Sequence, residues 1–309
     1  MALGLGIVVY WATQSGPAAA IISAFKSRVI ADGGTVESPS CAKSDVKFLL
    51  DNPVYNYLLD DYSGATAAYS LRLLDSTYSG DAIRVRRLSD NTEQNIGFVN
   101  NKLDTASLET FCSGTDGFVV IWYDQSGNGN NVTEASAANQ SQIVSAGSTI
   151  TDGGKPSILI NQSISRGLLI PIAASSRQDF FQVHKTNDDG FIIFKDSLST
   201  SRFSYAVSDG SQSTVFHLNY GTPSLYVNSS TESPVTRDDL HTLLSTNSQV
   251  LMTSLGGDSS QFTGGIQWGY YSSSFIYDGN VQEIIFYNSD QSSNRTGIET
   301  NINDYYSIY

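Results

Sequence analysis

The sequence predicts an all-β fold, an antiparallel sandwich or barrel, from two observations. The first is composition: charged residues make up only 15% of the 309 residues, whereas tyrosine and phenylalanine number 17 and 14. Long charged side chains favour helices, and aromatic side chains favour strands. The second is the pattern after residue 60, where short apolar runs alternate with turns rich in Ser, Asn, Asp and Gly. Such spacing is typical of strands joined directly to one another.

The predicted strands are short and lie between residues 117 and 287. In Val215–Tyr220 apolar and polar side chains alternate with period two, which indicates a half-exposed antiparallel strand. The strand-like runs are 117–123, 157–160, 180–185, 191–195, 203–207, 215–220, 224–227, 240–245, 250–254 and 281–287. Residues Asn294–Asn303 are compatible with a helix that closes the domain.

Residues 1–60 are predicted to form an N-terminal arm with short helices, ahead of a sandwich over residues 61–309. Ile21–Ile30 and Ser40–Leu50 are the helical candidates. The apolar run Ala2–Trp11 lacks the basic region that precedes a secretory signal and is too short to span a bilayer. It is therefore predicted to bury itself against a partner subunit, with a signal peptide as the alternative.

The formal net charge of −13 argues against nucleic acid and anionic membranes as partners, because both need clustered basic residues. Cys41 and Cys112 show no zinc-ligand spacing and are predicted to be buried thiols, with a long-range disulfide as the alternative. No cofactor is predicted. The acidic pairs Asp188-Asp189 and Asp238-Asp239 leave a structural calcium ion as an alternative.

Two stretches resemble known families. Residues 65–131 contain AYSLR, IRVRRLSDNTEQNIG and WYDQSGNGNN, which resemble the N-terminal part of the catalytic domain of α-L-arabinofuranosidase B enzymes. The chain's end, YDGNVQEIIFYNSD followed by NDYYSIY, is similar to the closing strand and helix of laminin G and concanavalin A-like modules. The resemblance implies a concanavalin A-like antiparallel β-sandwich (jelly roll). Without the enzyme's middle, it also implies a bacteriophage virion component.

Glycoside hydrolysis requires two carboxyl groups that flank the sugar. The downstream candidates are Asp188, Asp189, Asp209, Glu232, Asp238, Asp239, Asp258, Asp278 and Glu283. In the arabinofuranosidases the catalytic carboxylates lie in that region beside a vicinal cysteine pair, and this chain has no adjacent cysteines. The sequence therefore predicts no catalytic residue and a chain that is not an enzyme.

The WYDQSG motif is predicted to be structural. Asp124, Gln125, Gly127 and Asn128 belong to a turn that follows a strand. Arg84 and Arg86 are two residues apart and therefore share one face of a strand. We expect Asp124 to accept backbone or arginine hydrogen bonds, and Asp124 or Asp90 to pair with these arginines.

A glycan-binding surface is predicted at Trp268, Tyr270 and Tyr271, because aromatic faces among small polar residues stack on sugars. For Trp268 packing in the core is nevertheless the favoured role, as it is for Trp122, which lies within GFVVIWY.

These observations together predict a non-enzymatic bacteriophage virion structural protein on a head, tail or fibre surface. Its arm would bind other virion proteins, a homotrimer is the favoured assembly, and the sandwich would contact a cell-surface glycan. The alternative is a secreted, extracellular glycoside hydrolase of arabinofuranosidase type or a bacterial lectin module.

Overall fold

The computed structural model describes residues 55–161, 167–186, 190–198, 205–208, 211–245, 248–272 and 275–309. Within them, Leu58–Tyr309 form one compact unit. The apolar run at the N-terminus, the two helical candidates that follow it and Cys41 lie outside the described residues.

The elements occur in the following order. Helices are α4 (Leu58–Asp61), α5 (Thr105–Phe111), α6 (Arg237–Leu244) and α7 (Arg295–Tyr306), with 3-10 turns η1 (Ala137–Asn139) and η2 (Leu218–Tyr220). Strands are β1 (Ala67–Ser70), β2 (Ile83–Arg87), β3 (Glu93–Ile96), β4 (Phe98–Val99), β5 (Lys102–Leu103), β6 (Gly117–Trp122), β7 (Val132–Thr133), β8 (Gln142–Ser145), β9 (Ser148–Thr149), β10 (Thr151–Asp152), β11 (Lys155–Pro156), β12 (Ile158–Ile160), β13 (Leu168–Ile170), β14 (Gln178–Thr186), β15 (Gly190–Ile192), β16 (Phe194–Asp196), β17 (Ala206–Ser208), β18 (Ser224–Val227), β19 (Ser230–Glu232), β20 (Val250–Gly257), β21 (Ile266–Trp268), β22 (Tyr270–Ser272), β23 (Phe275–Ile276) and β24 (Gly279–Tyr287).

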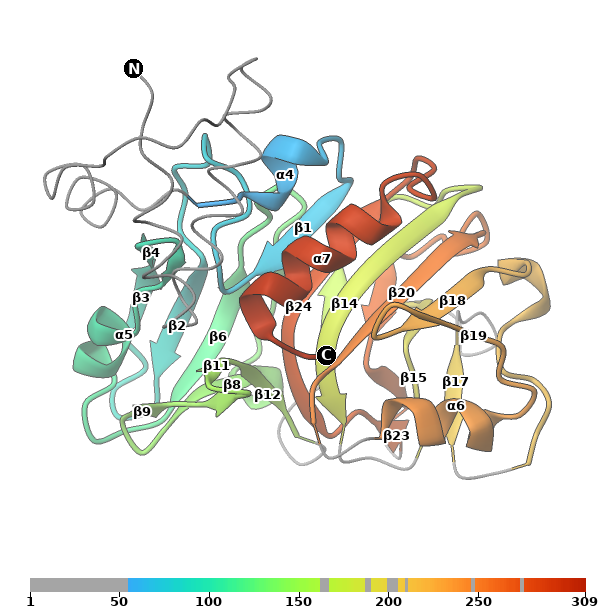
Figure 1. The fold of residues 1–309 in the computed structure, drawn as a ribbon. Coiled ribbons are helices and arrows are strands. Elements are labelled where there is room, and N and C mark those ends of the chain that lie inside the picture. Colours follow the sequence, from blue (N-terminus) through green and yellow to red (C-terminus); the bar gives the residue numbers. More distant parts are fainter. Residues whose placement is uncertain are drawn as a thin grey trace, which may run out of the picture. The chain divides into compact units, whose positions relative to one another are not determined.

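A 13-stranded antiparallel sheet forms the main layer (Figure 1). Its order is β19-β18-β20-β14-β24-β12-β8-β6-β2-β3, with β1 on β24, β7 on β6 and β9 on β8. The central pair β14 and β24 is buried along nearly its whole length, because other layers cover both faces. Both strands therefore bury polar side chains, such as Gln182 and Glu283, beside apolar ones.

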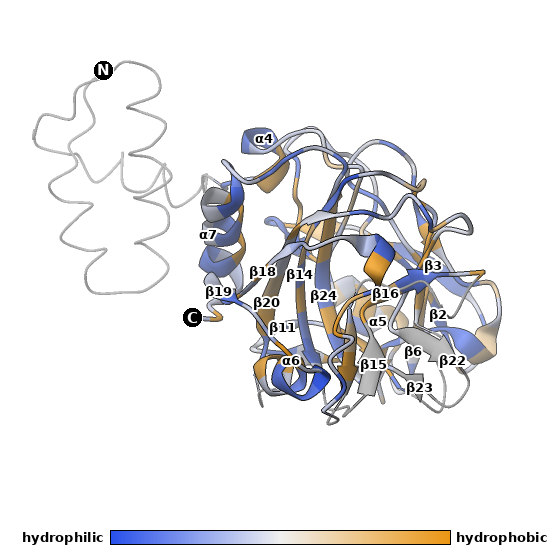
Figure 2. Ribbon diagram, turned by 90° about the vertical axis from the view of Figure 1, so that its right-hand side faces the viewer, coloured by the Kyte–Doolittle hydropathy of each residue, from blue (hydrophilic) through white to orange (hydrophobic). Residues whose placement is uncertain are grey.

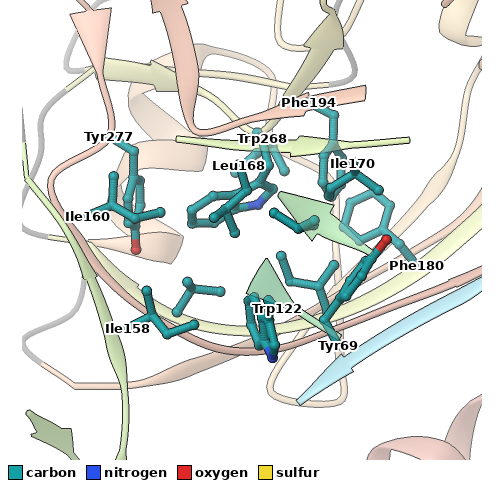
Figure 3. Close-up of a cluster of buried hydrophobic side chains, with 14 of the residues drawn as sticks. Tyr69, Trp122, Ile158, Ile160, Leu168, Ile170, Phe180, Phe194, Trp268 and Tyr277 are labelled. Atoms are coloured by element: carbon teal, nitrogen blue, oxygen red, sulfur yellow. The ribbon is translucent and has the colours of Figure 1, made fainter. Parts of the chain in front are cut away.

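A three-stranded sheet, β13-β21-β16, packs on one face of the main sheet. The larger core lies between these two layers and joins Trp122, Ile158 and Phe180 of the main sheet to Leu168 and Trp268 of the smaller one (Figure 3). The structure thus confirms the predicted all-β, antiparallel sandwich.

The opposite face of the main sheet is covered by α7 and α4 (Figure 1). Ile298 and Ile302 of α7 pack there against Phe181 and Ile285 of β14 and β24. In Figure 2 the main strands carry much of the hydrophobic colour, whereas α7 is largely hydrophilic on its visible side. The helix predicted at the end of the chain is confirmed, and none of the described helices is long and apolar enough to cross a membrane.

Two predicted strands are wrong. Residues 240–245 belong to α6, which begins with a capping box: the Thr236 side chain accepts from the Asp239 amide while Asp239 accepts from the Thr236 amide. Such reciprocal capping nucleates a helix despite an apolar sequence that also suits a strand. Residues 215–220 turn into η2 after one bridge at Phe216, and Leu218, predicted to be buried, is 89% exposed.

Candidate functional site

Asp124 holds the turn after β6 to the beginning of β1. Its Oδ1 accepts hydrogen bonds from the amides of Ala68 and Ser126, both at 2.9 Å. Its Oδ2 accepts from the Ser126 hydroxyl at 2.8 Å and from the Asn130 amide at 2.9 Å. The carboxylate is buried, so each of these bonds replaces contact with water. Asp124 is therefore a structural clamp.

Gln125 and Asn128 fasten the same turn to the chain that flanks β1. Gln125 forms three hydrogen bonds of 2.8–3.0 Å with the backbone of residues 70–74. The Asn128 amide donates to the carbonyls of residues 65–66 at 2.9 and 3.1 Å. Gly127 has φ of +83°, which a residue with a side chain adopts only with strain. All of these polar groups are used within the fold.

Within the described residues Arg84 and Arg86 pair with amide side chains and not with Asp124 or Asp90, which corrects the sequence prediction. Their hydrogen bonds, at 2.7–2.8 Å, join Arg84 to Asn95 and Arg86 to Gln140 and Asn91. Asp90 pairs instead with Arg87 at 2.7 Å. The backbone amides around Asp124 already occupy that carboxylate, so it is not available to either arginine.

Glu283 forms a buried ion pair with Arg72 and is not free to act on a substrate. Two bonds of 2.8 and 2.9 Å join the carboxylate to the guanidinium, and both side chains are almost fully excluded from solvent. Ser70 donates to the carboxylate at 2.7 Å, and Arg72 donates to Asn301 at 2.8 Å. This cluster links β1, β24 and α7, and the sequence did not reveal it.

Trp268 lies in the core and not on a glycan-binding surface. It is fully buried, its indole N–H donates to Gln182 at 2.9 Å, and its ring packs 4.7 Å from that of Tyr277. Tyr270 and Tyr271 lie on β22, but their side chains are outside the described part of the structure. The predicted aromatic surface therefore loses Trp268.

The acidic pair Asp238-Asp239 lies in the first turn of α6. Asp239 accepts from the amides of Thr236 and Val235, so it caps the helix. Among the described residues, no three His, Cys, Asp or Glu side chains are placed to hold a metal ion together. Asp188 and Asp189 lie outside those residues, whereas Cys112 is a buried free thiol.

Two other acidic residues contact the end of β14, and we call Asp152, Lys185, Thr186 and Asp278 the strand-end site. Lys185 Nζ lies 3.8 Å from Asp152 Oδ1, and the hydroxyl of the adjacent Thr186 lies 3.4 Å from the Asp278 carbonyl oxygen. Burial raises the pKa of Asp278. Burial also raises the pKa of Asp152, and Lys185 partly offsets that rise. Carboxyl groups of raised pKa suit proton donation near neutral pH.

His184 precedes the strand-end site and is fully buried, and neither ring nitrogen forms a hydrogen bond with a described residue. Burial lowers its pKa to about 3. The unfolded chain therefore binds one more proton between about pH 3 and 6.5. The stability that neutral His184 contributes is complete above pH 6.5 and is lost as the pH falls.

We expect His184 to make the free energy of unfolding fall by about 1.4 kcal/mol per pH unit below pH 6. Urea denaturation at pH 7, 6 and 5 measures this slope. His184→Gln, which cannot titrate, should show a shallower slope than the unaltered chain. Equal slopes for the two proteins would contradict the assignment.

Comparison with known proteins identifies the family. Residues 60–283 match the family model of the alpha-L-arabinofuranosidase B catalytic domain, which is well over half of the chain. The chain therefore belongs to the alpha-L-arabinofuranosidase B catalytic-domain family.

Individual relatives match over shorter stretches. A probable alpha-L-arabinofuranosidase B of Aspergillus niger is 36% identical over 81 residues, covering 26% of this chain and 16% of the relative. One from Aspergillus terreus is 40% identical over 79 residues, covering 24% and 16%. These matches thus span about one sixth of the curated relatives.

Solved structures match over a longer stretch. An arabinofuranosidase complexed with arabinofuranosyl-alpha-1,2-xylobiose has a TM-score of 0.45 and 16% identity, covering 79% of this chain and 64% of that one. A GH54 a-l-arabinofuranosidase soaked with a cyclic sulfate inhibitor gives a TM-score of 0.45 at 15% identity, with the same coverage.

The family match overturns two predictions. The sequence comparison had placed the resemblance at both ends of the sandwich and treated the enzyme's middle as missing, whereas the match continues through residues 60–283. The prediction of a non-enzymatic bacteriophage structural protein is therefore wrong. The prediction that the chain is not an enzyme is contradicted by the same finding, because the matched family is a catalytic domain.

Proposed function

We propose that this chain hydrolyses α-L-arabinofuranosides. The observation that carries the proposal is the match of residues 60–283 to a catalytic-domain family whose name states that activity. Arabinofuranosides that form part of polymeric glycans do not enter cells. We therefore also propose an extracellular location for the chain.

The proposed chemistry depends on two carboxyl groups. One protonates the oxygen of the leaving group as the glycosidic bond breaks, and the other either attacks the sugar or activates a water molecule. We do not propose Glu283 for either role, because its protonation or its bonding to a sugar would leave the buried guanidinium of Arg72 without a negative partner. Asp278 suits the acid role, because its pKa is raised by burial while its side chain remains partly exposed.

Two further features favour the strand-end site. The Asp278 carboxyl forms no hydrogen bond or ion pair with any other described residue, so its proton is not committed to the fold. Asp152 Oδ2 is buried and has no hydrogen-bond partner in the described part of the chain, whereas Oδ1 lies 3.8 Å from Lys185 Nζ. Asp152 is therefore the second carboxyl that we propose to test.

Asp278→Asn is expected to lower kcat/KM for methyl α-L-arabinofuranoside by about 10²–10⁴-fold if Asp278 is the acid. The loss should be much smaller for 4-nitrophenyl α-L-arabinofuranoside, because methoxide needs a proton to leave whereas 4-nitrophenolate does not. For the unaltered chain, kcat/KM should fall as the pH rises through the raised pKa of Asp278. Release of 4-nitrophenol and of L-arabinose measures both substrates.

Asp238→Asn is the matched control, since Asp238 is exposed on α6. It should retain full activity. An Asp278→Asn variant as active as this control on both substrates would remove Asp278 from the mechanism. Asp152→Asn, assayed alongside, tests the second role in the same way.

A further inference from the structure

A pocket of about 240 Å³ opens between the two sheets at the side of the sandwich away from α7. We call it the interlayer pocket. One wall comes from β6 and β7 and from the loop that carries Glu134 and Asn139; the other comes from β13 and β21 and includes Leu169 and Gln267. Asp152 and Asp278 do not line it, so it is distinct from the strand-end site.

We propose that the interlayer pocket binds one uncharged sugar ring, either a free monosaccharide or the terminal unit of a glycan. The volume of the interlayer pocket is smaller than the roughly 300–1,000 Å³ of sites that bind drug-sized ligands. A ligand of one sugar ring therefore suits its size. The proposal goes beyond the hydrolysis proposed above and does not depend on it.

The lining has the two kinds of surface that a sugar needs. Aliphatic side chains of β6, β7 and β13, among them Val120, Val132 and Leu168, offer contact to the C–H faces of a ring. Planar polar groups of Glu134, Asn139 and Gln267 can direct hydrogen bonds to its hydroxyls. Glu134 Oε1 already accepts from the Ser136 amide at 2.7 Å, which fixes the orientation of the carboxylate.

Trp122 lines the pocket on its β6 side, opposite Leu168 of β13. In Figure 3, Trp122 and Leu168 come from opposing layers of the core.

A charged ligand fits less well. The pocket holds one carboxylate and no Lys, Arg or His among its described lining residues, so it would repel anions. Cations such as calcium need six or more oxygen ligands, usually with several carboxylates. Water is the remaining occupant: at about 30 Å³ each, about eight molecules would fill the volume.

The experiment measures binding of L-arabinose and D-xylose to the full chain by saturation-transfer NMR and by titration calorimetry. We expect millimolar affinity, as is usual for a single small ring. Leu169→Trp, which fills the pocket from its partly exposed rim, should weaken binding at least 10-fold. Asn139→Ala should weaken it several-fold. Leu218→Trp is the matched control, because Leu218 is also exposed but lies on η2, and it should bind as the unaltered chain does.

Two results would overturn the proposal. The first is no binding of either sugar at 50 mM, which would leave water as the occupant. The second is binding that Leu169→Trp leaves unchanged, and its loss in Asp278→Asn would then place the sugar at the strand-end site. Hydrolysis of 4-nitrophenyl α-L-arabinofuranoside by Leu169→Trp is expected to persist, so failure of either proposal is distinguishable from failure of the other.

Discussion

Glu283→Gln is expected to lower the free energy of unfolding by about 3–5 kcal/mol, the usual effect of removing one partner of a buried ion pair. Glutamine cannot balance the positive charge of Arg72, which is 2% exposed and cannot reach water. It also has only one oxygen for the bonds that Ser70 and the guanidinium now make. Urea denaturation monitored by circular dichroism measures the change.

The double variant Arg72→Met, Glu283→Met separates loss of the pair from an isolated charge. Replacing both partners with apolar side chains of similar size is often nearly neutral. We therefore expect it to recover most of the stability lost by Glu283→Gln. Asp90→Asn, which breaks the exposed pair with Arg87, is the surface control and should change stability little. If Glu283→Gln and Asp90→Asn were equally mild, the Arg72 cluster would not be a structural centre.

Asp124→Ala is expected to cost about 3–5 kcal/mol as well, for a different reason. The substitution leaves the amides of Ala68, Ser126 and Asn130 without their acceptor, and each buried unsatisfied amide costs about 1–3 kcal/mol. The loop after β6 would then separate from β1. Thermal and urea unfolding measure the loss.

Asp124→Asn is an informative companion variant, since it keeps one carbonyl oxygen and replaces the other by a donor. Its cost should lie between that of the alanine variant and zero. Asp258→Ala, which removes the acceptor of a single exposed amide at Ser260, is the control. Equal melting temperatures for Asp124→Ala and Asp258→Ala would contradict the clamp.

Local chemistry made parts of this fold predictable from the sequence. The WYDQSG turn combines residues that tolerate positive φ with a carboxylate that caps backbone amides, so its structural role is evident from adjacent positions. The terminal helix and the buried strand at 281–287 carry equally local signals. By contrast, residues 240–245 have a sequence that suits a strand, and only the capping pair Thr236 and Asp239 indicates a helix.

The site was less predictable, because it depends on contacts between distant positions. Arg72 and Glu283 are 211 residues apart, and no spacing rule joins them. Asp278 was one of nine acidic candidates, and only its burial distinguishes it from Asp238. Asp152 was not among the candidates at all, since only the fold brings it within 3.8 Å of Lys185, which is 33 residues away in the sequence.

The predicted function was wrong because the absence of adjacent cysteines was given more weight than the WYDQSGNGNN motif. Membership of a catalytic-domain family follows from the pattern of residues 60–283 as a whole, which is spread over the middle of the chain. In a single sequence the resemblance is recognisable at Ala65–Asn131, where the motifs are strong. The weaker resemblance over the middle of the chain is recognised only by the family model.

The most direct test of the proposed activity is whether the purified full chain releases L-arabinose from methyl α-L-arabinofuranoside, followed by anion-exchange chromatography of the products. We expect release of L-arabinose that is reduced in Asp278→Asn and retained in Asp238→Asn. No release of L-arabinose after prolonged incubation with folded protein, together with no hydrolysis of 4-nitrophenyl α-L-arabinofuranoside, would contradict the proposed activity.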